Sequence, residues 1–189
     1  MLDNQGAKQS PSSDVKERRS AYSRSRTQYA AICFRQTADG DDCQIEILLI
    51  TSRDSRRWVI PKGWPLRKKM PHQVASTEAW EEAGVRGSVE KKVWGRYPYL
   101  KKMQDGELLP ILVDVHLLHV AGMDDEFPER KERTMRWFSP ADAASSVHES
   151  ELADLILMLD LYLSQAVVRR DAKRDVAHEM VFADARVQT

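Results

Sequence analysis

The segment Gly63–Val85 reads GWPLRKKMPHQVASTEAWEEAGV and contains the most informative pattern in the chain. Near its end stand Glu78, Glu81 and Glu82, whose spacings of three and four residues place them on one face of a helix. Like charges on one helix face repel each other, and no Lys or Arg stands among them. A helix face that holds a hard divalent cation against phosphate oxygens would explain this arrangement.

The surrounding sequence predicts the elements that hold this helix. Pro71 suits the first turn of the helix, and Gly84 suits a left-handed C-terminal cap. Apolar runs predict strands at 28–35, 45–51, 58–60, 89–99, 108–120 and 133–138, with turns at Asp39-Gly40 and at 104–106. Ser139 is expected to cap a short helix, and leucines at three- and four-residue spacing predict an amphipathic helix over 149–169. The expected fold class is α/β, with a mixed central sheet between helical layers.

The segment resembles the box of the Nudix hydrolase family, Gly-x5-Glu-x7-Arg-Glu-U-x-Glu-Glu-x-Gly-U, in which U is aliphatic. The matching residues are Gly63, Glu78, Glu81, Glu82, Gly84 and Val85. A wider resemblance runs over about residues 29–144. Its flanking stretches at 58–63 and 136–138 are most similar to the diphosphoinositol polyphosphate phosphohydrolase and dinucleoside polyphosphate hydrolase branch. The resemblance implies a Nudix-type α/β/α sandwich.

Two positions depart from the box. Lys69 stands six residues after Gly63, where the pattern has its first Glu, and Thr77 stands where it has Arg. In the family that arginine pairs with and orients the carboxylates, and the short neutral side chain of Thr77 cannot do so. The three helical acids are retained. The box is therefore degenerate, and the number of metal ions it holds is open.

The resemblance implies metal-assisted hydrolysis of a phosphoanhydride. Glu78, Glu81 and Glu82 are the expected catalytic residues, and with the backbone carbonyl of Gly63 they are the expected ligands of Mg²⁺ or Mn²⁺. One of these carboxylates would act as general base, and Glu78 is favoured. Glu129, in a later charged loop, is a further candidate ligand or base.

Basic residues near the box suggest an anionic substrate, because clustered cations attract phosphate. The residues proposed to bind substrate are Arg24, Arg26, Lys62, Arg67, Lys68, Lys69 and Arg133. Each of them also suits an ordinary solvated surface. Tyr97 and Tyr99 are candidates for stacking on a nucleobase, although tyrosines in a strand more often pack in the core or at the sheet edge.

Three functions fit these features. The first is hydrolysis of a nucleoside diphosphate-X or polyphosphate substrate, with diphosphoinositol polyphosphate as one candidate. The second is a dinucleoside polyphosphate or ADP-ribose pyrophosphatase. The third is a degenerate Nudix domain that binds a phosphorylated ligand without turnover. The sequence leaves the physiological substrate and the oligomeric state open.

Composition narrows the classes of partner. Lys and Arg balance Asp and Glu at 29 each in 189 residues, which argues against nucleic-acid binding. No apolar run approaches 18 residues and no apolar leader opens the chain, so we expect a cytoplasmic protein without a membrane span. The two cysteines, Cys33 and Cys43, are expected to be free thiols. Residues 1–23 are interpreted as a polar N-terminal segment, 24–169 as the Nudix domain and 170–189 as a C-terminal tail.

Overall fold

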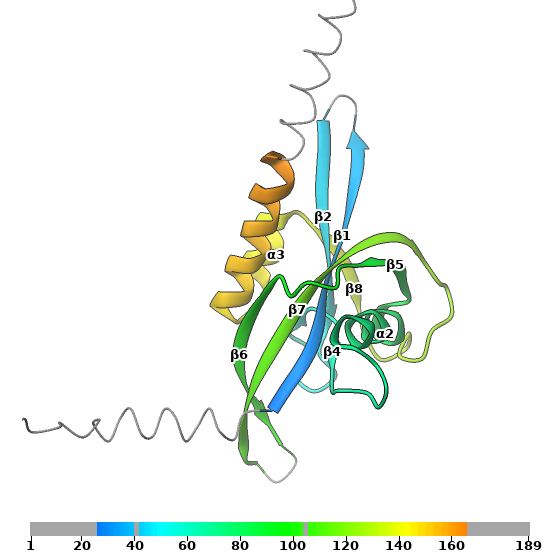
Figure 1. Ribbon diagram of the computed structural model, residues 1–189. Coiled ribbons are helices and arrows are strands. Elements are labelled where there is room, and N and C mark those ends of the chain that lie inside the picture. The colour runs from blue at the N-terminus through cyan, green and yellow to red at the C-terminus, as the bar shows by residue number, and fades with distance from the viewer. Residues whose placement is uncertain (1–25, 40–41, 104–105, 166–189) are drawn as a thin grey trace, which may run out of the picture.

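The strands form one mixed sheet with helices on both faces (Figure 1). The computed structural model describes residues 26–39, 42–103 and 106–165. The predicted N-terminal segment 1–23, Arg24 and the predicted tail 170–189 lie outside these residues.

The centre of the sheet consists of β1 and its two neighbours. β1 (Arg26–Asp39) pairs antiparallel with β2 (Asp42–Thr51) through the hairpin expected at Asp39-Gly40, and parallel with β7 (Leu108–Met123). The parallel pair makes the sheet mixed, as predicted. Strand β2 also pairs with β3 (Trp58–Val59) and β8 (Met135–Phe138), and β1 also pairs with β4 (Lys62–Gly63).

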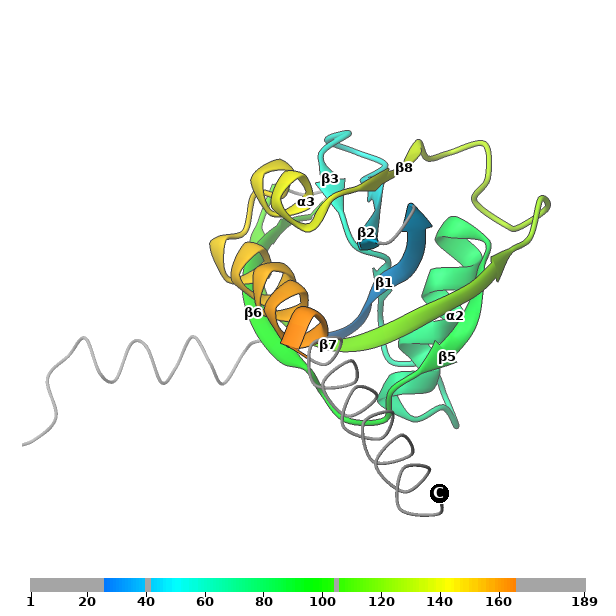
Figure 2. The same ribbon diagram turned by 90° about the horizontal axis from the view of Figure 1, so that it is seen from above.

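Successive side chains of β1 point to opposite faces of the sheet and enter two separate cores. Ala30, Ile32 and Phe34 belong to one core, and Ala31 and Cys33 to the other. The first core lies under α3 (Pro140–Ser146) and the helical residues 150–165, and the second lies under α2 (Pro71–Ala83) (Figure 2). Because both faces are covered, β1 and β2 are apolar along most of their length.

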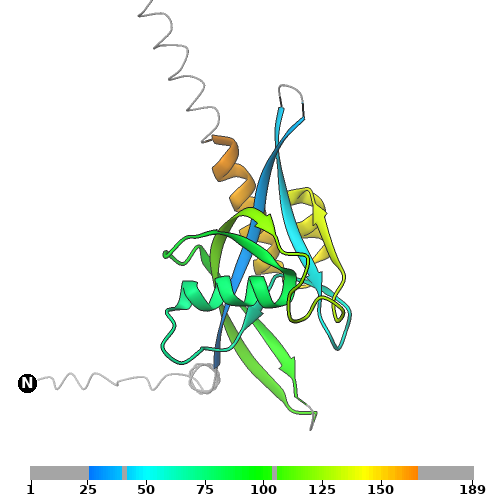
Figure 3. The same ribbon diagram turned by 90° about the vertical axis from the view of Figure 1, so that its right-hand side faces the viewer.

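Helix α2 lies across β1 and packs closely on it (Figure 3). Ala75, Ala79 and Ala83 recur every four residues on its buried face, and their small side chains let the helix approach the sheet. The cap at Gly84 has φ of 68°, as the sequence predicts. A Cβ there would lie 2.6 Å from the ring of Phe127, so the position requires glycine for space as well as for backbone conformation. The predicted bounds of this helix are confirmed.

The strand predicted at 89–99 is wrong in its bounds. The structure has β5 (Val85–Val89) and β6 (Gly95–Lys102), both antiparallel to β7, with residues 90–94 between them outside either strand. The N–H of Glu90 donates to Leu117 and that of Trp94 donates to Val115. The intervening residues therefore bulge away from β7, and hydrophobic alternation alone does not reveal such an interruption.

The C-terminal helices agree with the sequence where they are described. The Ser139 hydroxyl accepts a hydrogen bond from the backbone N–H of Asp142 at the start of α3. The predicted helix over 149–169 is helical over residues 150–165, and its last four residues lie outside the described part. Cys33 is a buried free thiol, as expected, and burial raises its pKa well above the usual range. No described helix is long and apolar enough to cross a membrane.

Candidate active site

A cleft of about 1240 Å³ opens beside α2 and joins segments far apart in the sequence. Its walls come from the 52–57 loop, β4, α2, β6 and the loop before β8. The acidic residues that line it are Asp54, Glu78, Glu82, Glu129 and Glu149, and the basic ones are Arg53, Arg57, Lys62, Lys101, Lys102 and Arg133. The cleft thus brings together carboxylates that suit a cation and cations that suit phosphate.

Glu78 lies directly against Gly63 of β4. A Cβ built on Gly63 would lie 2.1 Å from the carboxyl carbon of Glu78, so the close approach depends on the missing side chain. Burial, together with the nearby carboxylates of Glu82, Glu81 and Glu129, raises the pKa of Glu78 to about 7, and the charge of Arg133 partly opposes the rise. A carboxyl group with this pKa exchanges a proton near neutral pH.

Glu82 is buried and held by two partners, with 7% of the residue exposed. One carboxylate oxygen accepts a hydrogen bond of 3.0 Å from the backbone N–H of Lys62, and the other pairs with the guanidinium of Arg133. Burial raises the pKa of Glu82, while the charges of Arg133 and Lys62 oppose the rise. Each oxygen retains a second lone pair that points to no protein donor among the hydrogen bonds of the described residues.

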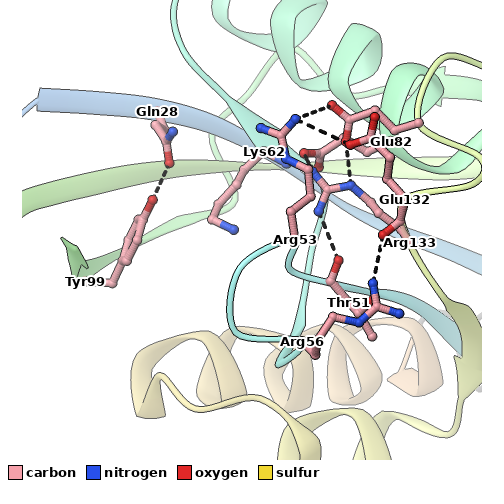
Figure 4. A network of polar contacts seen from close by, with 10 residues as sticks. Gln28, Thr51, Arg53, Arg56, Lys62, Glu82, Tyr99, Glu132 and Arg133 are labelled. Atoms are coloured by element: carbon pink, nitrogen blue, oxygen red, sulfur yellow. Dashed lines mark hydrogen bonds and ion pairs between the residues drawn. The ribbon is translucent and has the colours of Figure 1, made fainter. Parts of the chain in front are cut away.

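Arg133 links three parts of the site (Figure 4). Besides Glu82, it donates from Nε to Glu129 at 2.6 Å and from Nη1 to the backbone carbonyl of Thr51 at 3.0 Å. Its side chain is 6% exposed. Arg53 approaches the same Glu129 carboxylate at 3.4 Å from the other side.

Glu81 is not among the residues that line the cleft. Its backbone carbonyl accepts a hydrogen bond of 3.0 Å from the N–H of Glu129, which ties the loop before β8 to α2. Its part in metal binding stays a prediction. Glu129, by contrast, lines the cleft together with Glu78 and Glu82, which is the location that a metal ligand or a general base requires.

The two departures from the box contact each other. Lys69 Nζ donates to the hydroxyl of Thr77 at 2.7 Å, and that hydroxyl donates to the carbonyl of Gln73 at 2.8 Å. The loop before α2 is therefore attached to the helix by a hydrogen bond at the two positions where the box pattern has Glu and Arg. No charge pair forms there.

The predicted substrate-binding residues fall into two groups. Lys62 and Arg133 line the cleft. Arg26, Arg67, Lys68 and Lys69 are exposed and are not among its lining residues. A role for them in substrate binding stays a prediction, as does that of Arg24, which lies outside the described residues.

Several cleft residues were missed by sequence reasoning. Lys101 and Lys102 reach the cleft from the end of β6, and Lys101 Nζ lies 5.2 Å from the ring centre of Trp64. The position of these lysines depends on the pairing of β6 with β7. No short motif in the sequence indicates that they reach the cleft. Of the two tyrosines, Tyr97 is 1% exposed, whereas the Tyr99 hydroxyl bonds to Gln28 at 2.7 Å on the cleft wall (Figure 4).

The donor set fits Mg²⁺ or Mn²⁺ in its chemistry. Carboxylate oxygens are the ligands that these hard cations prefer, and the crowding of negative charge around Glu78 is what a dication would relieve. Within the described ranges, no three His, Cys, Asp or Glu side chains are gathered tightly enough to hold a metal ion as they stand. Glu78 and Glu82 would hold it after small side-chain adjustments, beside the backbone of Gly63.

The raised pKa of Glu78 predicts a pH effect on stability in the presence of a chelator. Between pH 4.5 and about 7, folded Glu78 keeps a proton that the unfolded chain has released. Its contribution to the free energy of unfolding is therefore full below pH 4.5 and lost as pH rises through about 7. We expect Glu78→Gln to flatten this decline in urea unfolding, whereas the exposed Glu126→Gln keeps it. Equal slopes for Glu78→Gln and the wild type would contradict the assignment.

Comparisons with known proteins find relatives of this chain among curated sequences. No family model matches the chain. Nudix hydrolase 17, mitochondrial, of Arabidopsis thaliana is 30% identical over 122 residues, which make up 61% of this chain and 62% of that protein. Nudix hydrolase 4 of the same plant is 30% identical over 115 residues, or 58% of this chain and 51% of that protein. The chain thus spans less than two thirds of either relative's length.

Solved structures share the fold at low sequence identity. The crystal structure of C. elegans Ap4A hydrolase has a TM-score of 0.53 and 17% identity, covering 74% of this chain and 98% of that one. The NUDIX domain of Shewanella oneidensis NrtR, complexed with ADP ribose, has a TM-score of 0.54 and 14% identity, covering 74% and 88%. The chain thus shares the α/β/α fold of these solved structures and, over part of its length, is similar in sequence to Nudix hydrolases.

Proposed function

We propose that this protein is a pyrophosphohydrolase that uses Mg²⁺ or Mn²⁺ to hydrolyse a phosphoanhydride of a small molecule. The observation that carries the proposal is the single cleft in which Glu78 and Glu82 of α2 face the cations Lys62, Lys101 and Lys102. A binding domain without turnover would not need repelling carboxylates beside a site for phosphate.

The residues of the cleft have separate tasks in this proposal. The divalent cation, when bound, neutralises diphosphate charge and lowers the pKa of the attacking water. Glu78 and Glu82 hold it, and Gly63 leaves room for Glu78. Lys62, Lys101 and Lys102 hold the non-reacting phosphates. Glu78 is the favoured general base for the attacking water.

Lys62 is the cation best placed for this task. Its backbone bonds to Glu82, while its ammonium group extends to 5.6 Å from the ring centre of Tyr99 across the cleft (Figure 4). Burial lowers the pKa of this ammonium group, and the charges of Glu82 and Glu149 counteract the shift. A cation already poor in water contacts loses little hydration when it meets a phosphate.

The candidate substrates divide into two kinds. Trp64 and Tyr99 on the cleft wall favour a substrate with a flat group, such as a dinucleoside polyphosphate or ADP-ribose, and the related folds include an Ap4A hydrolase and an ADP ribose complex. The basic residues fit a diphosphoinositol polyphosphate as well. The balance of five acids and six bases around the cleft favours the less highly charged, nucleotide-type substrate.

A substrate panel tests the proposal. Hydrolysis products of Ap4A, ADP-ribose, a nucleoside triphosphate and a diphosphoinositol polyphosphate would be separated and quantified by ion-exchange chromatography, each with Mg²⁺, with Mn²⁺ and with a chelator. We expect metal-dependent hydrolysis of at least one of them, with the nucleotide compounds turned over faster. Binding of these compounds without metal-dependent hydrolysis of any of them would establish the non-catalytic alternative instead.

A further inference from the structure

The box of this chain lacks its arginine, yet a guanidinium still contacts one carboxylate of α2, that of Glu82. It belongs to Arg133, which lies just before β8 and not on the helix. We infer that Arg133 is a positioning residue that replaces the missing box arginine and fixes Glu82 and Glu129 for metal binding. This inference rests on the proposed function of the same site.

The contacts of Arg133 favour positioning over substrate binding. Each of its three guanidinium nitrogens already donates to a protein acceptor, namely Glu82, Glu129 and the carbonyl of Thr51. These acceptors lie on α2, on the loop before β8 and at the end of β2. The side chain is 6% exposed, which leaves little surface for a phosphate. A planar fork between two carboxylates sets their separation and their orientation together.

The surroundings of Thr77 explain why the guanidinium comes from elsewhere. Lys69 Nζ lies 2.7 Å from the Thr77 hydroxyl, so an arginine at position 77 would face a lysine and not the acid of the family pattern. Two cations in contact repel each other. The chain therefore carries a lysine–threonine hydrogen bond on that side of α2 and a buried guanidinium on the cleft side.

Two arginines of the 52–57 loop contact the loop that carries Arg133. Arg53 approaches Glu129 at 3.4 Å and Glu132 at 3.6 Å, while Arg56 donates to the carbonyl of Glu132 at 2.8 Å (Figure 4). These contacts join the 52–57 loop to the loop before β8. Outer contacts of this kind fix the orientation of ligand carboxylates, and their loss commonly reduces metal affinity or activity 10- to 100-fold.

The first test compares Arg133→Gln and Arg133→Lys with Arg136→Gln, an exposed arginine three residues away. Mn²⁺ affinity would be measured by electron paramagnetic resonance without substrate, and kcat and KM with Ap4A or ADP-ribose. For Arg133→Gln we expect Mn²⁺ affinity and kcat each to fall about 10- to 100-fold with KM nearly constant. Arg133→Lys, which keeps the charge and loses the fork, should show a smaller loss in the same two quantities. Arg136→Gln should match the wild type.

Several results would overturn the inference. A raised KM with unchanged kcat would make Arg133 a substrate contact. Lower thermal stability with unchanged kcat and Mn²⁺ affinity would make it purely structural. Mn²⁺ binding that tightens would make it a competitor of the metal. If Arg133→Gln does not fold, Arg133→Lys decides, because wild-type kcat and Mn²⁺ affinity there would show that a charge suffices.

The second test rebuilds the box. Adding Lys69→Glu and Thr77→Arg to Arg133→Gln places an acid–arginine pair at the two positions that now share a lysine–threonine hydrogen bond. We expect this triple variant to regain Mn²⁺ affinity and kcat about tenfold over Arg133→Gln. No recovery in either quantity would contradict the replacement. If the wild type hydrolyses nothing, the proposed function fails, and the Mn²⁺ affinities still decide the role of Arg133.

Discussion

Glu78→Gln is expected to reduce metal-dependent hydrolysis at least about 100-fold in kcat, with a smaller effect on KM. The substitution keeps the shape of the side chain but removes the charge that holds the cation and the group that accepts a proton. Because Glu78 is partly desolvated and crowded by carboxylates, the neutral amide should fold at least as well as the acid at neutral pH. Steady-state product formation, followed by chromatography, and urea unfolding measure the two effects separately.

The exposed Glu126→Gln serves as the matched control for this variant, since Glu126 does not line the cleft. It should retain wild-type kcat. An activity of Glu78→Gln within a fewfold of wild type would remove Glu78 from the site and leave Glu82 and Glu129 as the remaining cleft acids of this cluster.

Gly63→Ala should produce a loss of similar size by a steric route. The new Cβ would lie 2.1 Å from the Glu78 carboxyl carbon and 2.2 Å from one of its oxygens, so the carboxylate must move. A displacement of about 1 Å in a reacting group lowers rates about 100-fold. We expect kcat to fall about 100-fold, while the circular dichroism spectrum shows unchanged secondary structure. Kinetics and Mn²⁺ binding on the purified variant measure the effect.

Gly122→Ala is the control for this substitution, because a Cβ at Gly122 in β7 meets nothing within 4 Å. It should behave as the wild type. Wild-type activity in Gly63→Ala would mean that the Glu78 carboxylate can move without loss of catalysis. The close packing of β4 against α2 would then not be required for activity.

Local patterns in the sequence predict the helix of the box and its acids well. Pro71, Gly84 and the four-residue spacing of Glu78 and Glu82 act within one helix, so their effects are visible in a short window. The apolar run of β2 likewise predicts a strand covered on both faces.

The sequence does not reveal which distant segments of the chain pair with each other. The bulge at 90–94 arises because β5 and β6 share the same edge of β7, and the arrival of Lys101 and Lys102 in the cleft follows from the same pairing. The contact of Arg133 with Glu82 spans 51 positions. Neither charge nor spacing in the sequence distinguishes Arg133 from the exposed cations Arg67 and Lys68, which are not among the residues that line the cleft.

Direct measurement of Mn²⁺ binding tests the central claim, that the α2 carboxylates hold a divalent cation in this cleft. The electron paramagnetic resonance signal of free Mn²⁺ would be followed as wild-type protein, Glu78→Gln and Glu82→Gln are added. The account predicts that the wild type removes the free signal, that Mg²⁺ restores it by competition, and that both variants bind at least about tenfold more weakly. Equal Mn²⁺ affinity in all three proteins would contradict the account.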